Sequence, residues 1–98
     1  MDIHRLNSNL LERKGKITNS QGMHARPAAK FAEIANKYKS EIIIKAKNKT
    51  IDGKSIIDLL TLGAEKGTEI IIIANGPDAA EALGVLEGLV KNNFNEDF

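Results

Sequence analysis

Glu69-Ile70-Ile71-Ile72-Ile73-Ala74 is the segment that decides the fold of this 98-residue chain. Four consecutive isoleucines favour extended backbone and predict a strand, and so apolar a run is typical of the centre of a sheet. The residues that follow, Asn75-Gly76-Pro77-Asp78, are typical of a turn. A sheet built around residues 69–74 is therefore the expected centre of the molecule.

A last helix is expected after this turn, from about Asp78 to Lys91. Its apolar residues recur every three or four positions and predict one buried stripe, formed by Ala82, Leu83, Leu86, Leu89 and Val90. Glycine weakens a helix by about 1 kcal/mol relative to alanine. Because Gly84 and Gly88 both lie in this helix, we expect close packing on the sheet to compensate.

Two strands and a short helix are expected before the central strand. Residues 41–47 alternate as a strand, with one face formed by Ile42, Ile44 and Ala46. Asn48 is the turn candidate, and Lys49 to Ile51 should return as a short antiparallel strand. The short helix runs from Ser55 to about Leu62 and should end at Gly63.

The N-terminal part begins with residues 1–9, which we expect to be a flexible extension of a single domain spanning residues 10–98. Leu10 to Thr18 alternates weakly as a strand, and Asn19 to Gly22 has turn chemistry. A helix is predicted from about Ala25 to Tyr38, with a buried face formed by Ala28, Phe31, Ala32, Ala35 and Tyr38.

The elements follow one another as β-α-β-β-α-β-α. Helices that alternate with short strands need a common surface, and a four-stranded sheet covered on one face supplies it. The expected fold class is therefore α+β. The tail, residues 92–98, is polar apart from Phe94 and Phe98 and carries no predicted element.

Composition narrows the function classes. The formal net charge of +1 gives no support to nucleic-acid binding. Cysteine is absent, which excludes disulfides, thiolate metal sites and thiol catalysis. No apolar run approaches the roughly 18 residues of a membrane helix, and the N-terminus lacks the pattern of a signal peptide. We expect a cytoplasmic protein with no metal, no cofactor and no membrane contact.

The candidate active residue is His24, in Gly22-Met23-His24-Ala25-Arg26-Pro27-Ala28-Ala29. It lies where a loop becomes a helix, beside the unsatisfied N–H groups of the first turn, where anions also bind. Positive potential there disfavours the imidazolium and keeps the ring neutral and nucleophilic near pH 7. If the ring were phosphorylated, these N–H groups and Arg26 would stabilise the added charge.

Both candidate residues, His24 and Ser55, also have a structural interpretation. The spacing around His24 supports a polar cap as well as it supports a phosphate carrier. A serine directly before a helix, as at Ser55, is an ordinary N-cap. Gly53-Lys54-Ser55 is similar to the end of a nucleotide-binding loop, but that loop needs a glycine where the chain has Asn48. Autonomous nucleotide use is therefore not expected.

The short helix is apolar on more sides than it can bury. Leu59 and Leu62 can face the core, whereas Ile56, Ile57 and Leu60 lie on other parts of the two-turn helix. We expect some of these three side chains to be exposed, and an exposed apolar cluster indicates a surface for a partner. The alternative is a helix buried nearly all round.

Together these residues resemble HPr, the histidine-containing phosphocarrier family of the bacterial phosphoenolpyruvate-dependent phosphotransferase system. The resemblance covers roughly Leu11 to Lys91. Residues 22–28 look like the family's active-site signature, and Lys54-Ser55-Ile56 through Thr61-Leu62-Gly63 resembles its regulatory segment. Ser55 follows His24 by 31 residues, which also fits the family.

The resemblance implies an open-faced β-sandwich, with four antiparallel strands and three helices on one face. It implies that His24 accepts phosphate on Nδ1 from the phosphorylated histidine of Enzyme I, assisted by Arg26, and passes it to a histidine of a IIA-type protein. Such a protein is a phosphoryl-transfer carrier rather than an independent enzyme. Ser55 matches the serine that an ATP-dependent HPr kinase/phosphorylase modifies in some bacteria.

A partner-binding surface is also implied, formed by Ala25, Pro27, Lys30, Lys54, Ile56, Ile57 and Leu60. A phosphate on Ser55 would add about two negative charges beside the apolar residues, which should weaken docking of an acidic partner. We expect the protein to act as a monomer.

The branch of the family stays open. Sugar-transport members often carry lysines where this chain has Glu33 and Asp58. The stretches that look more like NPr, the nitrogen-related branch, are Gly22-Met23-His24-Ala25, Gly76-Pro77-Asp78 and Phe94-Asn95-Glu96-Asp97. They favour regulation over sugar transport. A second function hypothesis, from a different class of protein, is a regulatory binding module. Its Ser55-phosphorylated form would dock on another protein.

Overall fold

The computed structural model describes residues 10–95. The extension expected at residues 1–9 lies outside the described residues, as do residues 96–98, and therefore stays a prediction. The described part forms the predicted order β-α-β-β-α-β-α with a short turn at its end. The elements are β1 (Leu10–Lys16), α2 (Ala25–Ala35), β2 (Glu41–Ala46), β3 (Lys49–Asp52), α3 (Ile56–Leu62), β4 (Glu69–Asn75), α4 (Ala79–Lys91) and η1 (Asn93–Asn95).

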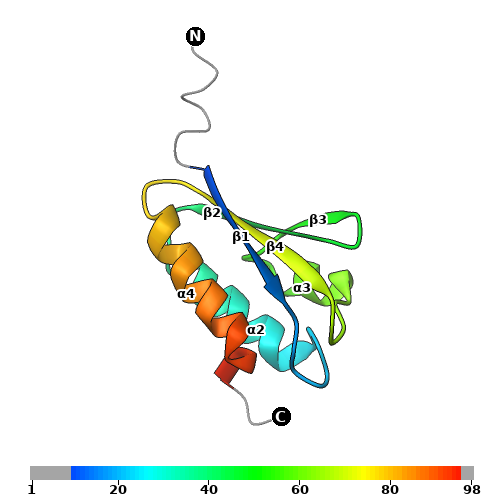
Figure 1. Ribbon diagram of the computed structural model, residues 1–98. Helices are drawn as coiled ribbons and strands as arrows, with labels where there is room; N and C mark the ends of the chain where they lie inside the picture. Colours follow the sequence, from blue (N-terminus) through cyan, green and yellow to red (C-terminus); the bar gives the residue numbers. More distant parts are fainter. Residues whose placement is uncertain (1–9, 96–98) are drawn as a thin grey trace.

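The four strands form one antiparallel sheet in the order β1-β4-β2-β3, so the isoleucine-rich β4 is an internal strand, as predicted. All three α-helices of the described residues lie on one face of this sheet, and the opposite face carries none of them (Figure 1). The α+β fold and the open-faced sandwich are confirmed.

The core fills the space between the sheet and the helices. Successive side chains of a strand point to opposite faces, so Ile42 and Ile44 of β2, with Ile70 and Ile72 of β4, are buried against the helices. The helices contribute buried residues that include Phe31, Ala35, Leu59, Leu62, Leu83 and Leu86. The alternate residues of β2 and β4 face the other way and are partly buried or exposed.

The hairpin between β2 and β3 has the turn predicted at Asn48. Lys47 and Asn48 have φ angles of 53° and 64°, which two-residue hairpin turns need if they are to match the twist of the strands. The ammonium groups of Lys47 and Lys49 reach α3, where they donate to Gly63 O over 3.1 Å and to Thr61 O over 3.4 Å. Cations at a helix C-terminus are favourable, so both lysines fasten the hairpin to α3.

α2 and β1 are shorter than predicted. The regular helix ends at Ala35, because Asn36 caps it by donating from Nδ2 to Ala32 O over 2.7 Å. The chain continues to Tyr38 in tighter turns, with Tyr38 N donating to Ala35 O over 3.2 Å. β1 ends at Lys16 rather than Thr18, since the partner strand β4 begins opposite it at Glu69.

The expected close packing of Gly84 and Gly88 on the sheet is wrong. Both glycines lie on the exposed side of α4, and a Cβ atom built at either would have no neighbour within 4 Å. The helix tolerates them because its opposite side buries Ala82, Leu83, Leu86, Leu89 and Val90, as predicted.

The end of the described chain is more structured than the sequence indicated. Phe94 is fully buried in the core. It is held in a turn in which Asn93, Phe94 and Asn95 have φ angles of 53°, 58° and 60°. Such left-handed residues are uncommon, and burial of the phenyl ring offsets their cost. The hydroxyl of Thr18 also donates to Oδ1 of Asn93 over 2.6 Å, which joins this turn to the loop that precedes α2.

A carboxylate joins the turn before α4 to the loop before β2. Asp78 accepts hydrogen bonds from the hydroxyl and N–H of Ser40 and from the N–H of Lys39. These bonds, the Ser40 hydroxyl first, lower the pKa of Asp78 from 3.8 to about 2. Gly76 is required beside them, since a Cβ there would lie 2.6 Å from the Ser40 Oγ. Among residues 10–95, no helix is long and apolar enough to cross a membrane.

Candidate functional site

The loop that carries His24 is fixed by backbone hydrogen bonds at both of its ends. At its start, the N–H of Ile17 donates to Thr68 O over 2.9 Å. At its end, the N–H of Met23 donates to Ala64 O over 2.7 Å. Both acceptors belong to the connection between α3 and β4. The loop therefore lies along that connection instead of projecting into solvent.

Gly22 allows this close approach. Its φ angle is +70°, and a Cβ atom at this position would lie 2.5 Å from Ala64 O and 2.9 Å from the Cα of Glu65. A positive φ and a lack of space for a side chain both require glycine. The predicted turn is confirmed by the hydrogen bond from Gly22 N to Asn19 O, which is 3.1 Å long.

Asn19 is a residue of this site that the sequence indicated only as a turn residue. It is fully buried, and its Nδ2 donates to Gly22 O over 2.8 Å. The same carbonyl accepts from His24 N over 3.0 Å. The side chain of Asn19 thus fixes the carbonyl group of Gly22, which also accepts the hydrogen bond from the backbone N–H of His24. The Oδ1 atom of Asn19 is buried without a hydrogen-bond partner in the described part of the chain.

His24 occupies the N-cap position of α2, but its side chain makes no capping hydrogen bond. The cap interpretation therefore holds for the backbone position and not for the imidazole. The side chain is half-buried, and its Nε2 atom is buried. Nε2 is therefore shielded from solvent.

The first turn of α2 is suited to a negatively charged group. It contains no acidic residue, and both Ala25 and Arg26 are exposed. His24 is at the positive end of the helix dipole, and Arg26 follows it by two residues in the sequence. The dipole and the guanidinium of Arg26 would both stabilise a phosphoryl group. Pro27 is buried, so little of its side chain is available to the contact surface in which it was expected. Its fixed φ fits the start of a helix.

Ser55 is the N-cap of α3, as its structural interpretation predicted. Its Oγ accepts a hydrogen bond from Asp58 N over 3.1 Å. Its side chain is half-buried and is flanked by two carboxylates. Asp52 accepts from Lys54 N over 2.9 Å, and Asp58 accepts from Asp52 N over 3.2 Å. A phosphate on Ser55 would therefore enter an acidic surrounding.

α3 runs antiparallel to α2, which puts Ser55 and His24 at opposite ends of the pair. The end of α2 meets the start of α3, where Asn36 Nδ2 donates to Lys54 O over 3.0 Å and Lys54 Nζ donates to Tyr38 O over 2.8 Å. The start of α2 meets the segment after α3 through the Met23–Ala64 bond. A helix of 11 residues is about 16 Å long at 1.5 Å per residue. The two candidate residues are thus not in contact.

An apolar patch on α3 extends between these two ends. Ile56, Ile57 and Leu60 are 45%, 75% and 41% exposed, and the sequence predicted exposure for some of them. Leu59 and Leu62 are buried, also as predicted. We call the three exposed residues the α3 patch. Within residues 10–95, no group of three His, Cys, Asp or Glu side chains is placed to hold a metal ion.

Comparison with known proteins identifies the family. Residues 11–92 match the family model described as "PTS HPr component phosphorylation site". The phosphocarrier protein HPr of Neisseria meningitidis is 38% identical over 87 residues, which cover 89% of this chain and 98% of the relative. The phosphocarrier protein NPr of Klebsiella oxytoca is 41% identical over 83 residues, which cover 84% of this chain and 92% of the relative.

Solved structures agree with these relatives. The crystal structure of HPr-C-His from Thermoanaerobacter tengcongensis has a TM-score of 0.85 and 36% identity, with 90% of this chain and 99% of that chain covered. A structure of Crh from Bacillus subtilis, described as a dimer with a swapped domain, has a TM-score of 0.69 and 35% identity and covers 85% of this chain and 95% of that one. The chain belongs to the HPr family, the phosphocarriers of the phosphotransferase system.

Proposed function

We propose that His24 carries the phosphoryl group between Enzyme I and a IIA-type protein. Its Nδ1 atom attacks the phosphorus of the phosphohistidine of Enzyme I, and a new N–P bond forms as the old one breaks, with the bonding pair returning to the ring of the donor. In the second transfer, a ring nitrogen of a histidine of the IIA-type protein attacks the same phosphorus. The N–P bond to His24 breaks, and the bonding pair returns to the ring of His24. The observation that carries this proposal is the burial of Nε2 at the N-terminus of α2.

Arg26 stabilises the transferred group in this proposal. Its guanidinium and the first-turn N–H groups offset the charge of the phosphoryl group at the start of α2. A contact of this kind contributes about 0.3–1 kcal/mol at an exposed helix end. So modest a contribution suits a carrier, which must hold the group and also release it.

The α3 patch provides the docking surface for Enzyme I and the IIA-type protein, together with Ala25 and Lys30 of α2. Support comes from the exposure of these residues. It also comes from the hydrogen bond between Met23 and Ala64, which joins the segment after α3 to the loop of His24. Pro27 is left out of this surface because it is buried. Lys54 belongs to its far end, where its ammonium already donates to Tyr38 O.

A test of the carrier role is incubation of the protein with phosphoenolpyruvate and the cognate Enzyme I. We expect one acid-labile, alkali-stable phosphate on the wild-type protein and none on His24→Ala. Arg26→Lys keeps the charge without the fork-shaped guanidinium and should be labelled more slowly. Equal labelling of the wild-type protein and His24→Ala would contradict the proposal.

The second candidate function is a regulatory binding module controlled at Ser55, with little or no role in sugar transport. The observation in its favour is the position of Ser55 directly before Ile56 and Ile57, where an added phosphate would change the charge of the α3 patch. An HPr kinase/phosphorylase would supply that phosphate from ATP. An acid-stable phosphate on Ser55, found by mass spectrometry of protein from its own cells, favours this function. A phenotype lost in His24→Ala and kept in Ser55→Ala favours the carrier.

We further infer a bacterial, cytoplasmic protein that acts as a monomer. The relatives carry both HPr and NPr names, so assignment to the sugar-transport or nitrogen-related branch rests on which IIA-type protein accepts phosphate from His24. The Crh relative with a swapped domain makes the oligomeric state a direct question. Sedimentation at several concentrations answers it, and a concentration-independent monomer mass is expected.

A further inference from the structure

The open face of the sheet has an apolar centre and a polar border. The edge strands β1 and β3 present Glu12, Lys14, Thr50 and Asp52 on this face, whereas the internal strands present Ile43, Ile71 and Ile73 between them. A sheet with one solvated face normally alternates apolar inside and polar outside. The three isoleucines depart from that rule and are only partly buried. A central apolar area inside a polar rim is the usual anatomy of a protein interface.

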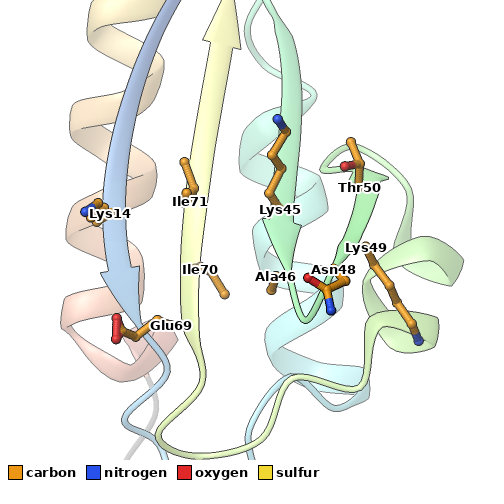
Figure 2. Close-up of a pocket in the computed structure, with 9 residues that line it drawn as sticks. All are labelled: Lys14, Lys45, Ala46, Asn48, Lys49, Thr50, Glu69, Ile70 and Ile71. Carbon is orange, nitrogen blue, oxygen red and sulfur yellow. The ribbon is translucent and has the colours of Figure 1, made fainter.

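The lower half of this face is hollowed. A cavity of about 540 Å³ is lined by residues of all four strands and of the β2–β3 turn. Across it, Lys14, Ile71, Lys45 and Thr50 stand side by side in one row of the ladder. Figure 2 shows Lys14 and Lys45 on either side of Ile71, with the helices behind the sheet. The pairing of β2 with β4 ends at Lys45 and Ile71, so the two strands separate below this row.

The charge of the hollow is positive. Three lysines, Lys14, Lys45 and Lys49, line it against one carboxylate, Glu69. The ammonium of Lys49 is directed to Thr61 O. The ammonium groups of Lys14 and Lys45 make no hydrogen bond or ion pair with any residue from 10 to 95. The two lysines are two strands apart, about 10 Å at 4.8 Å per strand, and are available for an external anion.

We propose that the open face is a second docking surface, which binds an acidic amphipathic segment of a partner protein. Apolar side chains of that segment cover Ile43, Ile71 and Ile73, and its carboxylates pair with Lys14 and Lys45. In the next row Asp52 and Glu12 flank Ile43 and Ile73. The carboxylates of the segment therefore lie at the Lys14 and Lys45 end, and its uncharged apolar end covers Ile43 and Ile73. The chemistry of the face therefore selects an occupant with both features.

This surface is independent of phosphoryl transfer. His24 and the α3 patch belong to α2 and α3, which lie on one side of the sheet (Figure 1). The strand register places Lys14 and Lys45 on the opposite face. A partner on the open face leaves the docking surface of Enzyme I uncovered. The protein can therefore bind an acidic partner and exchange phosphate at the same time, and loss of one activity need not affect the other.

A synthetic peptide in which glutamate and leucine alternate is a suitable probe, with a lysine–leucine peptide as its control. Titrated into the labelled full-length protein, the acidic peptide should shift the methyl signals of Ile71 and Ile73 in NMR spectra and leave those of Ile56 and Ile57 unchanged. Lys14→Glu combined with Lys45→Glu should weaken this binding about tenfold or more. Ile71→Thr, which keeps a β-branched residue, should weaken it through lost apolar contact.

The matched control combines Lys37→Glu with Lys66→Glu, two exposed lysines outside the sheet, and changes the net charge equally. This control should bind the acidic peptide about as the wild-type protein does. If both double variants bind the acidic peptide equally weakly, the loss of binding comes from the change in net charge and not from the positions of Lys14 and Lys45. That result would overturn the proposal. So would shifts confined to the helical side, or complete displacement of the peptide by pyrophosphate, which would make the hollow a site for small anions.

Discussion

Met23 and Ala64 are joined by a 2.7 Å hydrogen bond from the backbone N–H of the first to the carbonyl oxygen of the second. The residue before His24 is thereby tied to the segment that directly follows α3. Gly22 lies against the same carbonyl and has no room for a side chain. The position of His24 is thus set by a part of the chain that is distant in sequence.

Gly22→Ala should damage both stability and phosphoryl transfer. Its Cβ would lie 2.5 Å from Ala64 O at a φ of +70°, so the loop must move, at a cost of about 1–3 kcal/mol in the free energy of unfolding. A displaced His24 should accept phosphate from Enzyme I about tenfold more slowly or worse. Urea unfolding and the rate of labelling measure the two effects.

The control for that variant is Gly63→Ala. Gly63 has a similar φ of +62°, but the nearest atom to an added Cβ is 3.9 Å away. It should lose stability through the backbone conformation and keep its labelling rate. If both alanine variants slow transfer equally, the contact with Ala64 does not position His24.

Asn19→Ala should slow phosphoryl transfer by about tenfold. The substitution removes the bond that holds the carbonyl of Gly22 in place, although that carbonyl keeps the N–H of His24 as a donor. The loss of stability should therefore be moderate, about 1 kcal/mol. Asn36→Ala is the comparison, since Asn36 also bonds carbonyl oxygens through Nδ2 but lies at the far end of α2. It should lower stability without a comparable loss of transfer.

Charge at Ser55 should slow docking, because Ser55 is too far from His24 to touch the transferred phosphate. Aspartate and asparagine both serve as N-caps, so Ser55→Asp and Ser55→Asn differ mainly by one negative charge. We expect slower labelling by Enzyme I for Ser55→Asp alone, with the difference shrinking as salt is added. A difference that persists at high salt would indicate a direct effect on His24.

Gly84→Ala and Gly88→Ala should each stabilise the protein. Both positions are helical and open to solvent, and an added methyl group meets nothing within 4 Å. Replacing glycine by alanine at such positions raises the free energy of unfolding by about 0.4–1 kcal/mol. Thermal unfolding of the single and double variants checks this, and a lower melting temperature in either would show that α4 needs its glycines.

Asp78 should contribute to stability in a pH-dependent way. Its pKa is lowered from 3.8 to about 2 in the folded chain, so the folded state favours the carboxylate. The contribution is complete above the unfolded value and is lost as the pH falls from about 4 towards 2. The melting temperatures of wild type and Asp78→Asn should therefore differ at pH 6 and converge towards pH 2. A gap of constant size would rule out titration of Asp78 as its source.

Local patterns were sufficient to predict most of the fold. The isoleucines of β4, the alternation of β2 and the spacing of apolar residues in α4 each depend on periodicity within one element, which sequence displays directly. The same reasoning located Ser55 as an N-cap, and it found the exposed α3 patch because a two-turn helix cannot bury every side. Predicting these features requires no knowledge of which distant residues pack against each element.

Features that depend on distant partners could not be predicted. Asn19 looks like any turn residue until its burial is known, and the need for glycine at position 22 comes from Ala64. Gly84 and Gly88 are a different case. At about 100° per residue they lie opposite the predicted stripe of α4, so the spacing alone is enough to place them on the solvent side. Phe94 follows polar residues, and only the left-handed turn brings it into the core.

The fixed loop around His24 also has a kinetic consequence. A segment that is already ordered loses little conformational entropy when a partner arrives, so a small apolar contact is enough to form a complex. The same small contact keeps the lifetime of that complex short, because differences in affinity appear mainly in the rate of dissociation. Brief encounters would serve a phosphocarrier that exchanges its group with successive partners, and the rigidity set by Asn19, Gly22 and Ala64 would make such encounters productive.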